Sequence, residues 1–308
     1  MSDGTSERMK ILVTGGKGFI GSAVVRHLIN HTDHEVVNVD KMTYAATDGS
    51  TQSVADSPRL RFEQADICDI DRITEIFVEH APDVVMHLAA ESHVDRSIAD
   101  PAPFLSTNVG GVQALLEAVR AHLPQWPVHE QDAFRFLQVS TDEVFGSLAP
   151  EDPPFTEETP YAPRSPYAAS KAAADHLVRA YGHTYGLPVL ITNCSNNYGP
   201  RQFPEKLLPL AICNARDGRA VPVYGDGLQV RDWLHVDDHC EGILAALERG
   251  APGGTWCFGT GDGPTNLELL RTVCRALDAE LPAGAPHERC RRMLPPPGVR
   301  RGTAGNDS

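Results

Sequence analysis

The chain has 308 residues and a formal net charge of -14, which is long enough for one large domain or two smaller ones. This acidic balance argues against a nucleic-acid-binding surface, although it permits a local basic pocket for an anionic ligand. The seven cysteines are scattered, without a CxxC pair or zinc-ligand spacing, and the first nine residues lack the apolar core of a signal peptide. We expect a cytoplasmic protein with reduced thiols, no metal, no nucleic-acid partner and no membrane partner.

A glycine-rich turn follows the first predicted strand. Residues 10–14 form a short apolar run, and an apolar pattern of helical period covers residues 23–29. The turn between them satisfies both GxGxxG and GxxGxxG with Gly15, Gly16, Gly18 and Gly21. Such glycines let the backbone approach a pyrophosphate at the N-terminus of a helix.

An acidic residue closes the next predicted strand. Residues 35–39 are followed by Asp40, 19 residues after Gly21. A carboxylate at this place accepts hydrogen bonds from an adenosine ribose and repels a 2'-phosphate, which favours NAD over NADP. The alternative is a tight turn followed by a solvated acid, but the order of strand, glycines, helix, strand and acid favours the dinucleotide site.

Strands continue to alternate with helices along the chain. Further strands are predicted at residues 60–62, 83–88, 134–139 and 187–193. This alternation predicts an α/β fold with a doubly wound parallel sheet of the Rossmann type, whose strand carboxyl ends carry the ligand. An apolar stripe of helical period at residues 104–123 predicts a helix packed on the core or on a second subunit.

Two segments carry candidate acid and base groups. One strand leads into Thr141, Asp142 and Glu143, and a later helix presents Tyr167 and Lys171. Positions i and i+4 share a helix face, so we expect Lys171 to favour the Tyr167 phenolate by Coulomb attraction. Adjacent residues of an extended strand point apart, so spacing alone leaves open whether the two carboxylates share a pocket or are solvated separately.

The rest of the chain is less regular. Residues 150–163 are rich in proline and acid, which predicts a loop. We expect a NAD-binding domain that carries the catalytic residues at 1–192, an interleaved and incomplete substrate-binding domain at 193–281, and a disordered or atypical tail at 282–308. For Asn196 and Asn197 a ligand contact and a self-bonded polar turn are equally compatible with the sequence, and Arg231 alone favours a surface ion pair.

Six motifs together resemble the dTDP-glucose 4,6-dehydratases, which are extended short-chain dehydrogenases/reductases. The segments with this resemblance begin at residues 14, 66, 87, 140, 165 and 193, and they read TGGKGFIG, DICD, HLAAESHVDRS, STDEVFG, SPYAASK and NCSNNYGP. The glycines and the YxxxK pattern are shared by the whole superfamily. The Thr-Asp-Glu segment is more specific, because related epimerases lack this carboxylate pair.

The resemblance implies conversion of dTDP-glucose to dTDP-4-dehydro-6-deoxy-glucose and water, with hydride held in between by bound NAD. Tyr167, supported by Lys171, would take the proton of the sugar 4-hydroxyl, which Thr141 would also bind. Glu143 would remove the C5 proton, and Asp142 would protonate the departing 6-hydroxyl. It also implies a homodimer.

The resemblance further implies two sets of binding residues. Those for NAD are Gly15, Gly18, Phe19, Ile20, Gly21, Asp40, Lys41, Thr43, Asp66, Ile67, Leu88, Ala89, Ala90, Ser92, Thr107, Tyr167, Lys171 and Asn197. Those for the nucleotide sugar are Ser92, Thr141, Asn196, Lys206, Leu207, Pro222, Tyr224, Arg231 and Asn266.

The C-terminal region departs from the family pattern. The family continues with an Asp-Arg-Pro-Gly-His segment that helps to bind substrate, whereas this chain has an arginine-rich and proline-rich stretch. Three alternatives follow: a working dehydratase, a truncated NAD-binding relative with little or no turnover, and a 4,6-dehydratase for another sugar nucleotide such as UDP-glucose. A 4-epimerase is disfavoured, because it would have no use for Asp142 and Glu143.

Overall fold

The computed structural model describes residues 8–149, 151–221, 223 and 225–280. Pro222, Tyr224 and the predicted tail at 282–308 lie outside the described residues. Two compact units divide the chain: the first comprises the residues up to 197 together with 234–258, and the second comprises the remainder. The sequence placed 234–258 with the substrate-binding region, whereas the structure places this segment in the first unit.

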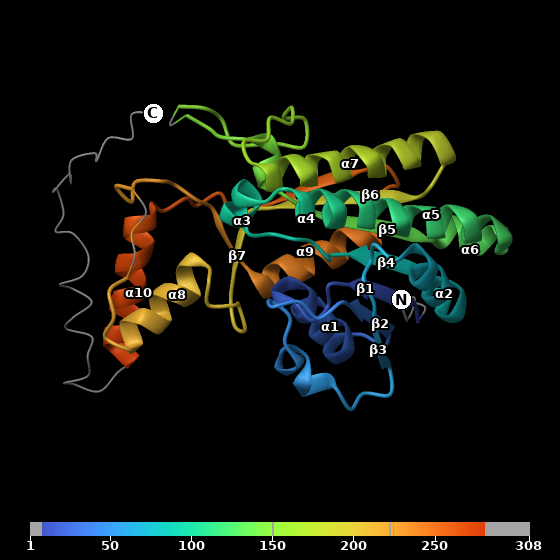
Figure 1. Ribbon diagram of the computed structural model, residues 1–308, viewed down its shortest axis with the longest axis horizontal. Helices are drawn as coiled ribbons and strands as arrows, with labels where there is room; N and C mark the ends of the chain where they lie inside the picture. The colour runs from blue at the N-terminus through green and yellow to red at the C-terminus, as the bar shows by residue number, and fades with distance from the viewer. Residues whose placement is uncertain (1–7, 150, 222, 224, 281–308) are drawn as a thin grey trace, which may run out of the picture. The chain divides into compact units, whose positions relative to one another are not determined.

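A parallel sheet forms the centre of the first unit (Figure 1). The described residues give it seven strands in the order β3-β2-β1-β4-β5-β6-β9. Their bounds are Lys10–Thr14 for β1, Glu35–Asp40 for β2, Leu60–Gln64 for β3, Val84–His87 for β4, Arg135–Thr141 for β5, Val189–Cys194 for β6 and Thr255–Phe258 for β9. Every pairing is parallel, which confirms the predicted doubly wound α/β fold.

Helices cover both faces of this sheet and enclose two separate cores. On one face α1 packs against α9, and on the other α5 packs against α2 and α7 (Figure 1). The bounds are Phe19–His31 for α1, Ile70–His80 for α2, Val94–Ala99 for α3, Ala102–Leu105 for α4, Val112–His122 for α5, Val128–Ala133 for α6, Pro166–Tyr185 for α7 and Val236–Arg249 for α9. Burial of the apolar strands on both sides explains why they contain uninterrupted runs of Val, Ile and Leu.

The predicted helix at 104–123 is interrupted by wider turns. A π-helical segment, η3, covers Ser106–Gly111 between α4 and α5. A Cβ atom added at Gly111 would contact the Ile67 side chain, so this turn lies close to the end of β3. The wider turns place Thr107 and Asn108 in buried positions near the carboxyl ends of the strands.

In the described part of the second unit, helices α8 at Leu207–Arg216 and α10 at Asn266–Glu280 pack together around a small apolar core. Short strands β7, Asn196–Tyr198, and β8, Trp233–His235, pair with each other. Within this unit the Asp232 carboxylate accepts hydrogen bonds from the backbone N–H groups of Thr260 and Gly261 at 3.0 and 2.7 Å. These bonds organise the loop that precedes α10.

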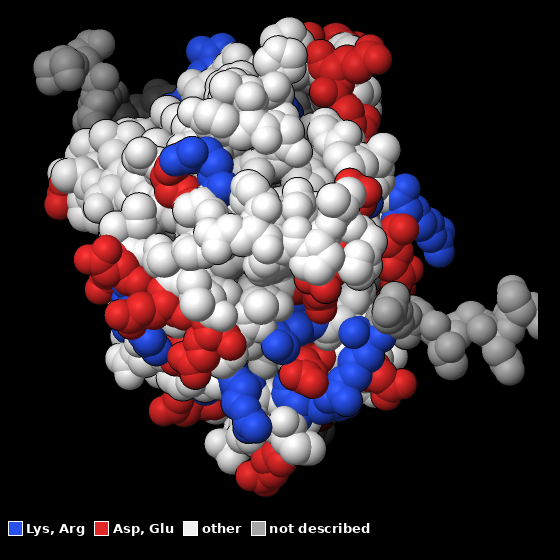
Figure 2. Space-filling view, turned by 90° about the vertical axis from the view of Figure 1, so that its right-hand side faces the viewer, with Lys and Arg blue, Asp and Glu red and all other residues white. Residues whose placement is uncertain are grey.

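Charged groups of both signs lie on the surface. In Figure 2 acidic and basic side chains are interspersed on the lower part of the visible face, and much of its centre carries neither. Among the described residues, none of the helices has the length and apolar character required to cross a membrane.

Candidate active site

The turn between β1 and α1 brings backbone close to backbone. Gly15 has a φ of 73°, and a Cβ atom there would lie 2.7 Å from Cα and N of Ala89 at the end of β4. The Gly15 N–H donates to the Val39 carbonyl at 2.8 Å, so the turn is also tied to β2. A Cβ atom at Gly21 would collide with the Gly15 carbonyl oxygen. Only glycines therefore fit at both positions.

The N-terminus of α1 opens from this turn. Gly18 is its N-cap, and among the described residues no side chain accepts from the first N–H groups of the helix. These donors and the helix dipole favour an anion, which is the arrangement that a dinucleotide pyrophosphate requires. Phe19 and Ile20 form the first turn of α1 and pack partly on the core below.

Asp40 is the last residue of β2 and is 8% exposed. Its carboxylate accepts from the Lys17 N–H at 2.9 Å and from the Met42 N–H at 2.8 Å. A carboxylate has about four acceptor sites, so it retains capacity for ribose hydroxyls. Asp40 thus holds the glycine turn against the loop after β2.

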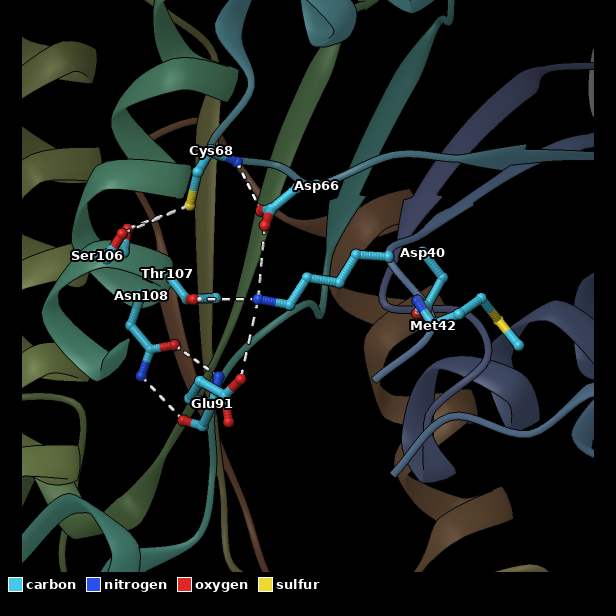
Figure 3. Close-up of polar contacts among 9 residues, drawn as sticks. Asp40, Met42, Asp66, Cys68, Glu91, Ser106, Thr107 and Asn108 are labelled. Atoms are coloured by element: carbon cyan, nitrogen blue, oxygen red, sulfur yellow. Dashed lines mark hydrogen bonds and ion pairs between the residues drawn. The ribbon is translucent and has the colours of Figure 1, made fainter. Parts of the chain in front are cut away.

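Lys41 contacts groups from three other parts of the sheet edge. These groups belong to Asp66, Glu91 and Thr107, which are labelled in Figure 3. Lys41 Nζ is 3.6 Å from Asp66 Oδ2, 3.9 Å from Glu91 Oε1 and 3.5 Å from Thr107 Oγ1. Asp66 follows β3, Glu91 follows β4 and Thr107 belongs to η3. Predicted cofactor residues from separate segments therefore lie together, whereas Glu91 was not predicted.

Thr14 and His87 form a buried pair that links the ends of β1 and β4. Thr14 Oγ1 accepts from the N–H groups of Leu88 and Ala89 at 3.2 and 3.3 Å and lies 2.6 Å from His87 Nδ1. Burial, followed by the Lys171 charge, lowers the pKa of His87 to about 3. The ring is therefore neutral.

The carboxylate pair lies on a turn at the end of β5. That strand ends at Thr141, and the 3-10 turn η5 covers Asp142–Phe145. Thr141 caps this turn by accepting from the Glu143 N–H at 3.3 Å and donates to Asp142 Oδ1 at 3.3 Å. Because the chain leaves the extended conformation at Asp142, the alternation of an extended strand does not apply to the pair.

Tyr167 lies in the first turn of α7. Ser165 caps this helix by accepting from the Ala168 N–H at 3.1 Å, and Pro166 is its first residue. The Ser97 hydroxyl of α3 accepts from the Tyr167 N–H at 3.1 Å. The phenol hydrogen-bonds with Thr141 and is buried.

The surroundings of Tyr167 oppose ionisation of its phenol. Burial, and then Coulomb interactions with Glu143, Cys194 and Asp142, raise the pKa of Tyr167 well above its ordinary value of 10. These interactions and the contact between η5 and α7 place both carboxylates near the phenol. The Lys171 ammonium donates to the Val139 carbonyl at 2.8 Å, and its effect on the Tyr167 phenolate stays a prediction.

The remaining predicted cofactor residues have the following positions. Thr43 follows β2, Ile67 follows β3, Leu88, Ala89, Ala90 and Ser92 follow β4, and Asn197 lies in β7. The Asn197 amide donates to the Ser195 carbonyl at 3.0 Å, and its oxygen lies 2.8 Å from His239 Nδ1. The bond to Ser195 is local, whereas the contact with His239 joins distant parts of the chain, and the contact of Asn197 with NAD stays a prediction.

Most of the predicted substrate residues belong to the second unit. Lys206 is the N-cap of α8 and Leu207 its first residue, while Asn266 begins α10 and donates to Gln229 Oε1 at 3.4 Å. Arg231 is exposed and donates to the Val230 carbonyl at 3.0 Å. Asn196 begins β7, and Pro222 and Tyr224 are not among the described residues.

Sequence reasoning missed two buried residues that support the site. Asn108 of η3 donates to the Ser170 hydroxyl at 2.8 Å and to the Glu91 carbonyl at 2.9 Å, which ties α7 to the segment after β4. Asp175 of α7 accepts from the Ser140 hydroxyl at 2.6 Å. The i+8 spacing from Tyr167 was the pattern that could have identified Asp175.

The site therefore combines three elements at one edge of the sheet. A dinucleotide-type turn lies at the ends of β1 and β2, a phenol and a buried ammonium lie on α7, and two carboxylates lie on η5. Such a set can transfer a proton to or from a hydroxyl and can supply an acid and a base to a neighbouring carbon and its leaving group.

Comparisons with known proteins agree with this architecture. The family model described as GDP-mannose 4,6 dehydratase matches residues 12–288. A dTDP-glucose 4,6-dehydratase of Neisseria meningitidis is 56% identical over 89% of this chain and 78% of its own length.

Solved structures show the same fold. A dTDP-glucose 4,6-dehydratase of Streptomyces venezuelae, with NAD and TYD bound, has a TM-score of 0.80 and 45% identity over 88% of this chain and 81% of its own. A UDP-glucose 4-epimerase of Thermus thermophilus in complex with NAD has a TM-score of 0.77 and 31% identity, and covers 88% of this chain and 84% of its own. The chain belongs to the dTDP-glucose 4,6-dehydratase family of extended short-chain dehydrogenases/reductases.

Proposed function

We propose that the chain is an NAD-dependent dTDP-glucose 4,6-dehydratase, a hydro-lyase that forms dTDP-4-dehydro-6-deoxy-glucose and water. The observation that carries the proposal is the placement of Asp142 and Glu143 on a turn beside Tyr167, where both carboxylates act electrostatically on the phenol. A 4-epimerase needs only oxidation and reduction at C4, whereas loss of water requires a further acid and base.

The residues at the glycine turn fit NAD. The close approach of Gly15 to Ala89 and the open N-terminus of α1 suit a pyrophosphate, and Asp40 suits a ribose with a free 2'-hydroxyl. NAD takes up hydride from C4 of the sugar and returns it to C6, so none is consumed overall. Gly15, Gly18, Gly21 and Asp40 would hold it, with Lys41, Asp66 and Thr107 beside them.

The side chains of this chain account for the proton transfers. Tyr167, as the phenolate, removes the proton of the 4-hydroxyl, and Thr141 holds this oxygen. The resulting 4-ketone acidifies the C5 hydrogen, which Glu143 removes. Asp142 donates a proton to the departing 6-hydroxyl, which leaves as water, and C5 is then reprotonated. Two carboxyl groups of opposite protonation state are therefore required.

The substrate assignment has separate support. The relatives compared above act on dTDP-glucose by name, and one of their structures contains TYD together with NAD. Contacts of the nucleotide sugar with Ser92, Asn196, Lys206, Leu207, Arg231 and Asn266 remain predictions, as do those with Pro222 and Tyr224. UDP-glucose as the substrate, and NAD binding with little or no turnover, are the alternatives. A homodimer and a cytoplasmic location also remain predictions.

Two substitutions test the assigned roles. Glu143→Gln should abolish product formation yet leave C4 oxidation detectable as a transient absorbance of reduced nicotinamide, because only the C5 base is lost. Tyr167→Phe should lose this transient as well. Glu130→Gln, which removes an exposed carboxylate on α6, serves as the control and should behave as the unchanged chain. Normal product formation by Glu143→Gln would remove Glu143 from its role.

A further inference from the structure

Asp175 is a carboxylate with 0% exposure in the middle of α7. It lies four residues after Lys171 and eight after Tyr167, so the three side chains follow one face of the helix. The proposed proton transfers leave it without a role. A charged group buried this completely is costly unless its surroundings compensate the charge.

Three donors from two other elements converge on the Asp175 carboxylate. The Ser140 hydroxyl of β5 and the Tyr161 hydroxyl donate to Oδ2 at 2.6 and 3.0 Å, and Gln138 Nε2 lies 3.5 Å from Oδ1. Arg179 in turn donates to the Tyr161 hydroxyl at 3.0 Å. These donors fix the orientation of the carboxylate and favour its ionised form, although burial raises the pKa of Asp175.

Lys171, at 4% exposure, donates to the Val139 carbonyl at 2.8 Å. Val139 lies in β5 between Gln138 and Ser140, the two strand residues that reach the Asp175 carboxylate, so the ammonium and the carboxylate approach the same short stretch of the strand. Burial lowers the pKa of Lys171, and the negative charge of Asp175 is the first of the two that oppose this effect. The second is Cys194, but burial raises the pKa of its thiol to about 12, so this thiol is neutral near pH 7. Asp175 therefore supplies the anionic charge that keeps the ammonium protonated.

We propose that Asp175 is a positioning residue that keeps Lys171 protonated and directed toward β5 beside Tyr167. The inference rests on the proposed function, in which the Lys171 charge assists ionisation of Tyr167. Glu143 and Asp142 oppose that ionisation, so a positive charge at Lys171 would act against them. Asp175 acts through Lys171 and contacts neither the sugar nor the cofactor in this assignment.

Lysine side-chain NMR tests the proposal directly. The chain contains five lysines, so a sample labelled with ¹³C at lysine Cε gives few resonances. The Lys171 resonance is assigned as the one that disappears in Lys171→Arg. In the unchanged chain Lys171 should be protonated at about pH 7.5, and in Asp175→Asn its pKa should fall by about one to three units. An unaltered titration in Asp175→Asn would overturn the proposal.

A control separates charge from structure. Tyr161→Phe removes a hydrogen bond to the same carboxylate but keeps the negative charge of Asp175. The pKa of Lys171 should therefore be the same in this variant as in the unchanged chain. The titratable groups around the pair are Tyr161, Tyr167, Arg179, Cys194 and His87. Apart from Tyr161 in its own variant, none of them is changed. If Asp175→Asn fails to fold, the titration of Lys171 in the unchanged chain still tests the proposal. A neutral Lys171 at about pH 7.5 would contradict it.

The test is independent of turnover. If the chain did not convert dTDP-glucose, the Lys171 titration would still report on Asp175. If the titration failed to shift, the dehydratase assignment would stand without this residue. The pH profile of C4 oxidation is a second readout. On the alkaline side of this profile, the decline in rate should begin at a lower pH in Asp175→Asn than in the unchanged chain.

Discussion

Acid should destabilise this fold through the buried ring of His87. The pKa of His87 in the folded chain is about 3, against about 6.5 when the chain is unfolded. A folded-state pKa below the unfolded value contributes stability above pH 6.5, and this contribution is lost as the pH falls from 6.5 toward 3. Protonation would also place a positive charge in a fully buried position that already feels the Lys171 charge.

The magnitude follows from the difference in proton binding. At about pH 5 the unfolded state has bound the proton and the folded state has not, which removes about 2 kcal/mol of unfolding free energy relative to pH 8. His87→Asn keeps a polar group near Thr14 but has no titrating ring. The variant should be less stable at pH 8, because it leaves a cavity, yet should lose about 2 kcal/mol less between pH 8 and pH 5.

Urea unfolding at a series of pH values measures this difference. His129→Asn is the matched control, because its ring is 83% exposed. The control should show the same pH dependence as the unchanged chain. Equal losses of stability in His87→Asn and in the unchanged chain would refute the assignment of a neutral, buried His87.

Two further substitutions probe the cofactor turn and the fold. Gly15→Ala should weaken NAD binding at least about tenfold and cost at least about 1 kcal/mol of stability, because φ is 73° and the Cβ atom meets Ala89 backbone; calorimetric titration measures the first effect. Gly49→Ala, whose Cβ atom meets no described atom within 4 Å, is its control, and equal NAD affinity in both variants would contradict this account. Asp69→Ala should cost about 1 kcal/mol by removing the cap of α2, whereas Asp69→Asn should be nearly neutral in thermal unfolding, and equal losses would exclude a capping role.

The sheet could be predicted because its strands are buried on both faces. The segments 11–13 and 189–191 are apolar throughout and lie inside the strands Lys10–Thr14 and Val189–Cys194. The cofactor turn could also be predicted from local sequence, because glycines follow the first strand and an acid ends the second. The four-residue strand β9 was not predicted, because its residues are only half-buried and its pairing with β6 depends on distant contacts.

The details of the site depended on tertiary structure. The backbone turn at Asp142 determines where the carboxylates lie, and the sequence motif alone does not predict this turn. The π-helical turns at Ser106–Gly111 place Asn108 against α7, although the sequence there has an ordinary helical period. The i+4 spacing places Lys171 and Tyr167 on one face of α7, but the hydrogen bond of Lys171 to Val139 and the counter-charge of Asp175 could be seen only in the fold.

The central claim is tested most directly by incubating the purified chain with dTDP-glucose and detecting the 4-keto-6-deoxy product, with bound NAD measured in the same sample. The account predicts steady product formation without net consumption of NAD, and slower turnover of UDP-glucose. Bound NAD with intact dTDP-glucose would contradict the dehydratase assignment and favour the alternative of a cofactor-binding relative without turnover.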